Sequence, residues 1–147
     1  MNKLLTISLC SVALFFGCFS VTIADSFEEG FQAAIAGDYP TAMKIFKQFS
    51  EQGDAYAQSN LGVMYGLGEG APKDKIIAYM WYYLANETSQ RYGKSNLRLL
   101  SKEMTSKELR IAQELSQKCL NSDYKNCESA LPNFLHRKFN LSSEEKD

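Results

Sequence analysis

The chain has 147 residues, with 16 Lys and Arg against 17 Asp and Glu, and a formal charge of −1. This length is typical of one domain, and the balanced charge lacks the basic excess that favours nucleic-acid binding, so we expect no nucleic-acid partner. Apolar residues make up 45% of the chain and aromatic residues 12%. That composition supplies a hydrophobic core and excludes disorder throughout.

The N-terminal segment has the order of a targeting signal. Lys3 is followed by a run, residues 4–23, that contains no charged side chain. Thr22 and Ala24 are small enough for a signal peptidase site, so residues 1–24 are predicted to be a cleaved signal peptide that delivers the protein to the periplasm or the medium. Two alternatives stay open: an uncleaved anchor, and a lipid attached at Cys18, because Gly17-Cys18 is similar to the end of a lipobox. After cleavage no membrane span is expected.

The cysteines agree with export. Two of the four leave with the signal peptide, and Cys119 and Cys127 remain eight positions apart. In an oxidising compartment such a pair predicts a disulfide. A metal site would need more ligands than this pair and the distant His136 supply, so neither a metal nor a cofactor is expected.

Residues 25–127 repeat themselves. Tyr56-x-x-Ser59-Asn60-Leu61 recurs as Tyr92-x-x-Ser95-Asn96-Leu97, a shift of 36 residues. A period near 35 with helical spacing of apolar residues predicts stacked helix pairs, here about three pairs in an all-α solenoid. No run of alternating β-branched residues suggests a sheet.

Six helices are expected. Capping boxes at Ser26 and Thr105 open the first and the sixth, and Asp74 opens the fourth. The first helix is predicted to bury Phe27, Phe31, Ala34 and Ile35. A glycine-rich turn, residues 66–72, separates the third helix (54–65) from the fourth, and the fifth is expected near residues 91–103. Residues 128–147, with a charged end, are predicted to be a loosely held tail.

Residues 57–85 carry a family resemblance. The stretch AQSNLGVMYGLGEGAPKDKIIAYMWYYLA is similar to a Sel-one-like repeat, a relative of the tetratricopeptide repeat. The flanking helices are similar to degenerate outer repeats, so the resemblance spans roughly residues 27–127 of a small exported member. The matching positions, expected to have structural roles, are Ala57, Leu61, Gly62, Tyr65, Gly68, Gly70, Asp74, Ala78, Trp81, Tyr82 and Ala85.

The resemblance implies a non-enzymatic adaptor or scaffold that binds a protein or peptide partner. In stacked helix pairs the first helix of each pair lines the concave side, where extended binding surfaces lie. The outward positions of the third and fifth helices are therefore the candidate partner-binding residues: Tyr56, Ser59, Asn60, Val63, Tyr92, Ser95 and Asn96.

The alternative is a cell-wall enzyme or inhibitor, since cysteine-rich members of the family are linked with β-lactam recognition and hydrolysis. Those members carry a cysteine pair in each repeat, whereas this chain has one pair outside the signal peptide. No catalytic residue is assigned, because the sequence shows no nucleophile and base at a characteristic spacing and its one histidine lies in the tail. The glycine-rich turn lacks the Lys-Ser/Thr ending of a phosphate-binding loop.

Overall fold

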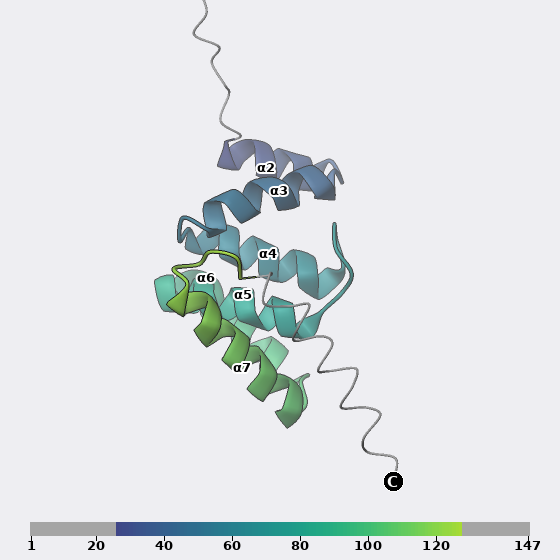
Figure 1. Cartoon of the computed structure of the whole chain (residues 1–147). Coiled ribbons are helices and arrows are strands. Elements are labelled where there is room, and N and C mark those ends of the chain that lie inside the picture. Colours follow the sequence, from purple (N-terminus) through teal and green to yellow (C-terminus); the bar gives the residue numbers. More distant parts are fainter. Residues whose placement is uncertain (1–25, 128–147) are drawn as a thin grey trace, which may run out of the picture.

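The computed structural model describes residues 26–127, which form six α-helices and contain no strand (Figure 1). The predicted signal peptide, Cys18, the tail from residue 128 and His136 lie outside these residues. None of the described helices has the length and apolarity to cross a membrane. The helices are α2 (Phe27–Ile35), α3 (Tyr39–Ser50), α4 (Ala55–Leu67), α5 (Lys75–Thr88), α6 (Gln90–Ser101) and α7 (Ser106–Asn121).

The helices pack in chain order. In Figure 1 they follow one another from α2 at one end to α7 at the other. α2 packs on α3, α3 on α4, and α4 on α5, which also contacts α6 and α7. The all-α prediction is confirmed, and this sequential packing is consistent with stacked helix pairs.

Both predicted capping boxes are present. The Glu29 amide donates to the Ser26 hydroxyl at 3.1 Å, while the Ser26 amide donates to the Glu29 carboxylate at 2.8 Å. Thr105 and Glu108 make the same reciprocal pair at 3.2 and 2.9 Å. These bonds satisfy helix-end amides that otherwise have no partner, so the sequence places both helix starts correctly.

Asp74 caps α5, and its loss should be measurable. One carboxylate oxygen of Asp74 accepts from the amides of Ile76 and Ile77 at 2.8 and 3.1 Å. We expect Asp74→Ala to lower the free energy of unfolding by about 1 kcal/mol, because both amides then lose their acceptor. Urea unfolding followed by circular dichroism measures the change. Asp38→Ala is the control, since Asp38 caps α3 through a single bond of 3.3 Å, and an equal loss in both variants would contradict the prediction.

The core is centred on α5. Trp81 is 2% exposed, as predicted, and Leu61 of α4 and Phe46 of α3 are buried with it. Gly62 of α4 faces Tyr82, where an added Cβ would lie 2.5 Å from the tyrosine ring. The helices therefore approach closely at this point. Most of the positions predicted to be structural are buried: Ala57, Leu61, Gly62, Tyr65, Ala78, Trp81, Tyr82 and Ala85.

The predicted buried face of α2 is wrong in part. Phe31 is 36% exposed and Ile35 66% exposed. Gly30 is the buried position instead, and an added Cβ there would lie 2.7 Å from Cγ2 of Ile45 on α3. The contact between the two helices runs through this glycine, so Ile35 lies on a side of α2 that the described helices leave exposed.

The glycine-rich turn begins later than predicted. α4 continues through Gly66 to Leu67, and the third helix is therefore longer than the expected 54–65. Gly68 ends it with a φ of 85°, and Gly70 follows with a φ of 79°. These two glycines have the left-handed backbone that the turn requires, whereas Gly66 is an ordinary helical residue.

The predicted disulfide between Cys119 and Cys127 is present, with the two Cα atoms 4.8 Å apart. The segment it closes turns back toward the middle of the molecule. The Tyr124 ring lies against Gly53, before α4, and its hydroxyl is 3.4 Å from that of Thr88 at the end of α5. Tyr124 is half-buried there, so the disulfide fastens α7 to the central pair.

Candidate binding groove

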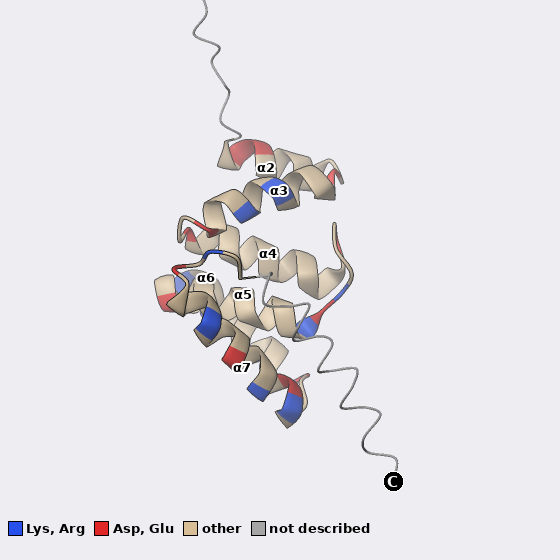
Figure 2. Cartoon of the chain, in the orientation of Figure 1, with Lys and Arg blue, Asp and Glu red and all other residues tan. Residues whose placement is uncertain are grey.

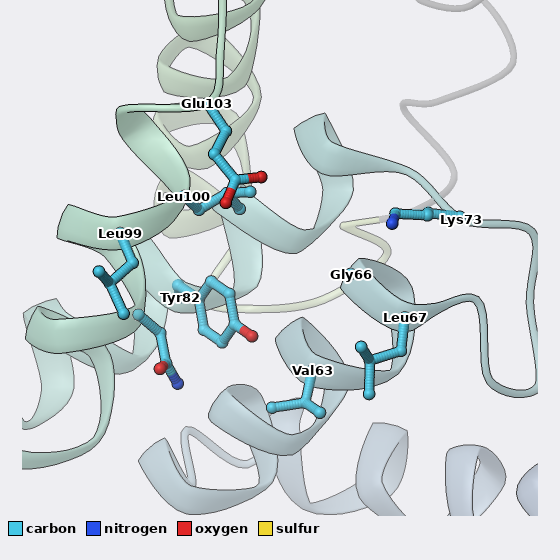
Figure 3. Close-up of a pocket in the computed structure, with 9 residues that line it drawn as sticks. Val63, Gly66, Leu67, Lys73, Tyr82, Leu99, Leu100 and Glu103 are labelled. Carbon is cyan, nitrogen blue, oxygen red and sulfur yellow. The ribbon is translucent and has the colours of Figure 1, made fainter.

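A groove of about 350 Å³ lies between α4 and α6, with α5 behind it (Figure 3). Small-molecule and side-chain pockets of proteins begin at about this size. α4, α5, α6 and the segments that follow α4 and α6 all contribute to its wall. The lining residues are Val63, Gly66, Leu67, Lys73, Tyr82, Asn96, Leu99, Leu100 and Glu103.

Apolar side chains form the two rims. Leu67, in the last turn of α4, is 63% exposed, and Leu99 of α6 is 55% exposed. Val63 and Leu100 add apolar surface to the wall. In the described part of the chain only three large apolar residues are more than half exposed: Ile35, Leu67 and Leu99. Two of them border one groove, and an apolar surface gathered in this way is typical of an interaction site.

The floor of the groove holds the hydroxyl of a largely buried side chain. Tyr82 is 8% exposed, and its phenol oxygen points into the groove, toward Val63 and Gly66 in Figure 3. None of the described residues makes a hydrogen bond to this oxygen. Burial raises the pKa of Tyr82 to about 12, so the phenol keeps its proton at neutral pH. It is therefore available as a hydrogen-bond donor.

Gly66 makes the hydroxyl accessible. An added Cβ at Gly66 would lie 4.0 Å from the Tyr82 oxygen and 3.8 Å from Cβ of Ala78. Those are ordinary contact distances, so no clash requires a glycine here. The absent side chain instead leaves the floor open beside the phenol.

Charges of both signs lie at the mouth of the groove. Lys73 lines one side, and no ion pair is recorded for it within residues 26–127. Glu103 lines the other side and is paired with Lys75 at 3.6 Å. The acid is thus partly neutralised, whereas Lys73 remains available to a ligand.

Two of the predicted partner-binding residues line this groove, Val63 and Asn96. They come from α4 and α6 respectively, as the sequence analysis expected. Asn60, the counterpart of Asn96, lies outside the lining, and its side-chain amide donates to the backbone oxygen of Tyr56 at 2.9 Å. Ser95 is exposed on α6.

Two of the remaining predicted residues, Tyr56 and Tyr92, belong to an aromatic row outside the groove lining. The ring of Tyr56 lies 5.1 Å from that of Tyr92 and 5.2 Å from that of Phe27, so the row joins α2, α4 and α6. Ser59 is buried, and its hydroxyl donates to the backbone oxygen of Tyr92 at 2.9 Å. Tyr56 is 39% exposed, and the Arg91 guanidinium carbon lies 5.5 Å from the centre of the Tyr92 ring.

The sequence analysis did not predict a binding role for several of the groove residues. Tyr82 was assigned to the core, and Leu67, Leu99 and Lys73 were given no role. One signal was present: Leu99 lies 36 positions after Val63, the same offset that relates Asn96 to Asn60. No signal in the sequence shows that the oxygen of the largely buried Tyr82 side chain points into a groove.

A second hollow of about 460 Å³ lies beside α3. Its wall consists mainly of one helix, with Lys44, Lys47, Gln48 and Glu51 contributing long polar side chains. Lys44 and Lys47 already have interactions within the protein. The groove between α4 and α6 is therefore the better candidate for a binding site, since three helices and the turn after α4 converge on it.

No protein-family model, curated protein or solved structure matches this chain. Within residues 26–127 no group of His, Cys, Asp and Glu side chains is arranged to hold a metal ion. The case for function therefore rests on the groove and its chemistry.

Proposed function

We propose that this protein is a non-enzymatic interaction module that binds a segment of a partner protein in the groove between α4 and α6. One observation carries the proposal: two exposed leucines, Leu67 and Leu99, border a hollow whose floor presents the hydroxyl of Tyr82, which has no hydrogen-bond partner among the described residues. An apolar surface with a few directed polar groups is the general form of a specific binding site.

We further propose that the helix pairs are degenerate Sel-one-like repeats. Three features support this: the motif in residues 57–85, the sequential packing of the helices, and the contact between Tyr56 and Tyr92, which lie 36 residues apart. In such stacks the first helices of successive pairs form one continuous surface. The groove would then be a part of that surface.

We also propose that the protein acts outside the cytoplasm, in the periplasm or the medium. The disulfide between Cys119 and Cys127 is typical of an oxidising compartment. The signal-like residues 1–24 agree with this placement, and an anchor or a lipid on Cys18 would leave the domain in the same compartment.

A selection of random peptides against the purified protein tests the groove. We expect the enriched peptides to lose at least tenfold in affinity for Leu67→Glu and for Leu99→Glu, because each variant places a charge on an apolar rim and a tenfold loss corresponds to about 1.4 kcal/mol. Isothermal titration calorimetry measures the affinities. Each variant changes an exposed residue, so the melting temperature should stay nearly constant.

Ile35→Glu is the matched control. Ile35 of α2 is 66% exposed, close to the 63% of Leu67, but it lies outside the groove. Equal loss of binding in all three variants would show a non-specific apolar effect, and no loss in the two groove variants would remove the groove as the site. Hydrolysis of a chromogenic β-lactam by the purified protein would instead favour the enzymatic alternative.

A further inference from the structure

The chemistry around the groove indicates what kind of segment it takes. We propose that the ligand is an extended peptide with an apolar residue flanked by acidic residues: the apolar side chain enters between Leu67 and Leu99, and a backbone carbonyl accepts a hydrogen bond from Tyr82. This inference rests on the proposed function and adds the class of the ligand. It follows from the charged residues around the groove and from the two residues that shape its floor, Tyr82 and Gly66.

The groove lining has one charge of each sign, Lys73 and Glu103, and the two helices that flank it, α4 and α6, together contain cations and no acids. α4 contains no charged residue, and Figure 2 shows it entirely in the neutral colour. α6 contains Arg91, Lys94 and Arg98 and no acid. These three cations are exposed on one helix face, at spacings of three and four residues, and Lys102 extends the row.

The nearby acids are already engaged, unlike Lys73. Glu103 pairs with Lys75, and Glu69, in the turn after α4, hydrogen-bonds the Tyr39 hydroxyl and raises the pKa of Tyr39. A ligand that contacts Lys73 in the groove and continues over the exposed face of α6 would meet Arg98 and Lys102, which lie outside the groove lining. Acidic flanks complement this distribution, whereas basic flanks would be repelled.

The floor favours a peptide backbone over a bulky polar group. Gly66 has no side chain, so a main chain can approach the Tyr82 oxygen closely. The phenol oxygen is open to the groove, protonated and without a partner among the described residues, so it can donate a hydrogen bond to a carbonyl of the ligand. Asn96, beside it in the wall, offers both a donor and an acceptor to the next peptide group.

Three fluorescent nine-residue peptides test the ligand class. The first has Leu-Gly-Leu at its centre with Asp and Glu on both sides, the second replaces the acids with Lys, and the third replaces both Leu with Ser. Fluorescence anisotropy against the purified protein measures their affinities at low and high salt. We expect the acidic apolar peptide to bind at least tenfold more tightly than the other two, and its affinity to fall with added salt.

Two variants test the floor without removing the groove. Tyr82→Phe deletes only the hydroxyl and should weaken the acidic peptide by about fivefold, the usual effect of one hydrogen bond. Gly66→Ala places a methyl group beside the phenol at ordinary contact distance. It should weaken binding by a similar factor while the melting temperature does not fall, so lost binding cannot be attributed to lost folding.

Two further variants test the charge. Lys73→Glu should weaken the acidic peptide by at least fivefold and improve the basic one. Lys125→Glu is the control, because Lys125 is an exposed cation in the disulfide-closed segment and outside the groove lining. It should change either affinity by less than about twofold.

The results separate this inference from the proposed function. If peptides bind at the groove, as shown by loss in Leu99→Glu, but basic peptides bind best or Tyr82→Phe has no effect, the ligand class is wrong and the groove remains a binding site. If neither the three designed peptides nor any peptide from the random selection binds with saturation, both proposals fall. Binding to anionic lipid vesicles that is lost in Lys73→Glu and Leu99→Glu, with no peptide binding, would replace the peptide by a membrane surface.

Discussion

Gly93→Ala should lower the free energy of unfolding by about 3 kcal/mol, the upper part of the usual range for overpacking a core. An added Cβ at Gly93 would overlap the backbone nitrogen of Asn86 and the backbone oxygen of Tyr82, and would lie 2.6 Å from the Asn86 Cα. All of these atoms belong to the α5 backbone, so no side-chain rotation relieves the overlap. α6 must move away from α5 as a whole, and the contact between them loosens.

Gly66→Ala is the matched control for this change. Gly66 is also a helical glycine, but an added Cβ there meets its nearest neighbour at 3.8 Å. Because alanine is the better helix former, we expect the free energy of unfolding to stay constant or to rise by up to about 1 kcal/mol. Denaturant unfolding of both variants measures the difference, and a Gly93→Ala variant as stable as the wild type would show that the two helices are not in close contact.

Removing the disulfide should cost about 2.5 kcal/mol of stability. The bond between Cys119 and Cys127 closes a loop of eight residues, and the chain-entropy relation gives this value for so short a loop. The double variant Cys119→Ala/Cys127→Ala avoids wrong pairing of a single thiol. Both sulfur atoms belong to buried residues, so alanine leaves no unsatisfied polar group behind.

The loss should be concentrated at the end of α7. Within the closed segment Asp123, Tyr124 and Asn126 have φ angles of 53°, 62° and 56°, which non-glycine residues rarely adopt. Without the covalent bond these residues can relax, and Tyr124 should leave its place beside Gly53 and Thr88. Hydrogen exchange should then show lost protection of the Tyr124 amide, which donates to the Cys119 oxygen at 3.1 Å.

Two observations control the disulfide prediction. Adding a reductant to the wild-type protein should reproduce the stability of the double variant, and should leave the variant itself unchanged. Peptide mapping of protein isolated without reductant should find Cys119 and Cys127 joined. Free thiols at both positions in that protein, or a double variant within 0.5 kcal/mol of the wild type, would contradict a stabilising bond.

Local interactions were predictable from the sequence because they join residues close in the chain. The capping boxes at Ser26 and Thr105 depend on a spacing of three residues, and the structure forms both. The same holds for Asp74 at the start of α5 and for Cys119 and Cys127, which only a short turn separates. The apolar spacing around Trp81 likewise predicted its burial.

The candidate site was predictable only in part. The repeat offset of 36 residues predicted binding residues on α4 and α6, and two of them, Val63 and Asn96, line the groove. The same pattern also selected Ser59 and Asn60, whose side chains bond to the backbone of Tyr92 and Tyr56. A sequence period identifies equivalent positions on two helices, but it does not show which of them face an opening.

The sequence by itself determined the set of helices, their starts, the core residues of α4 and α5, and the cysteine pair. Each of these depends on short spacings along the chain or on hydrophobic periodicity. Only the tertiary structure decided three other features: that Gly30 and Gly93 are points of close helix contact, that Ile35 stays exposed, and that the Tyr82 hydroxyl opens into a groove between two leucines. The physical reason is that each depends on the angle and distance between helices. Those quantities are set by the packing of side chains far apart in the sequence.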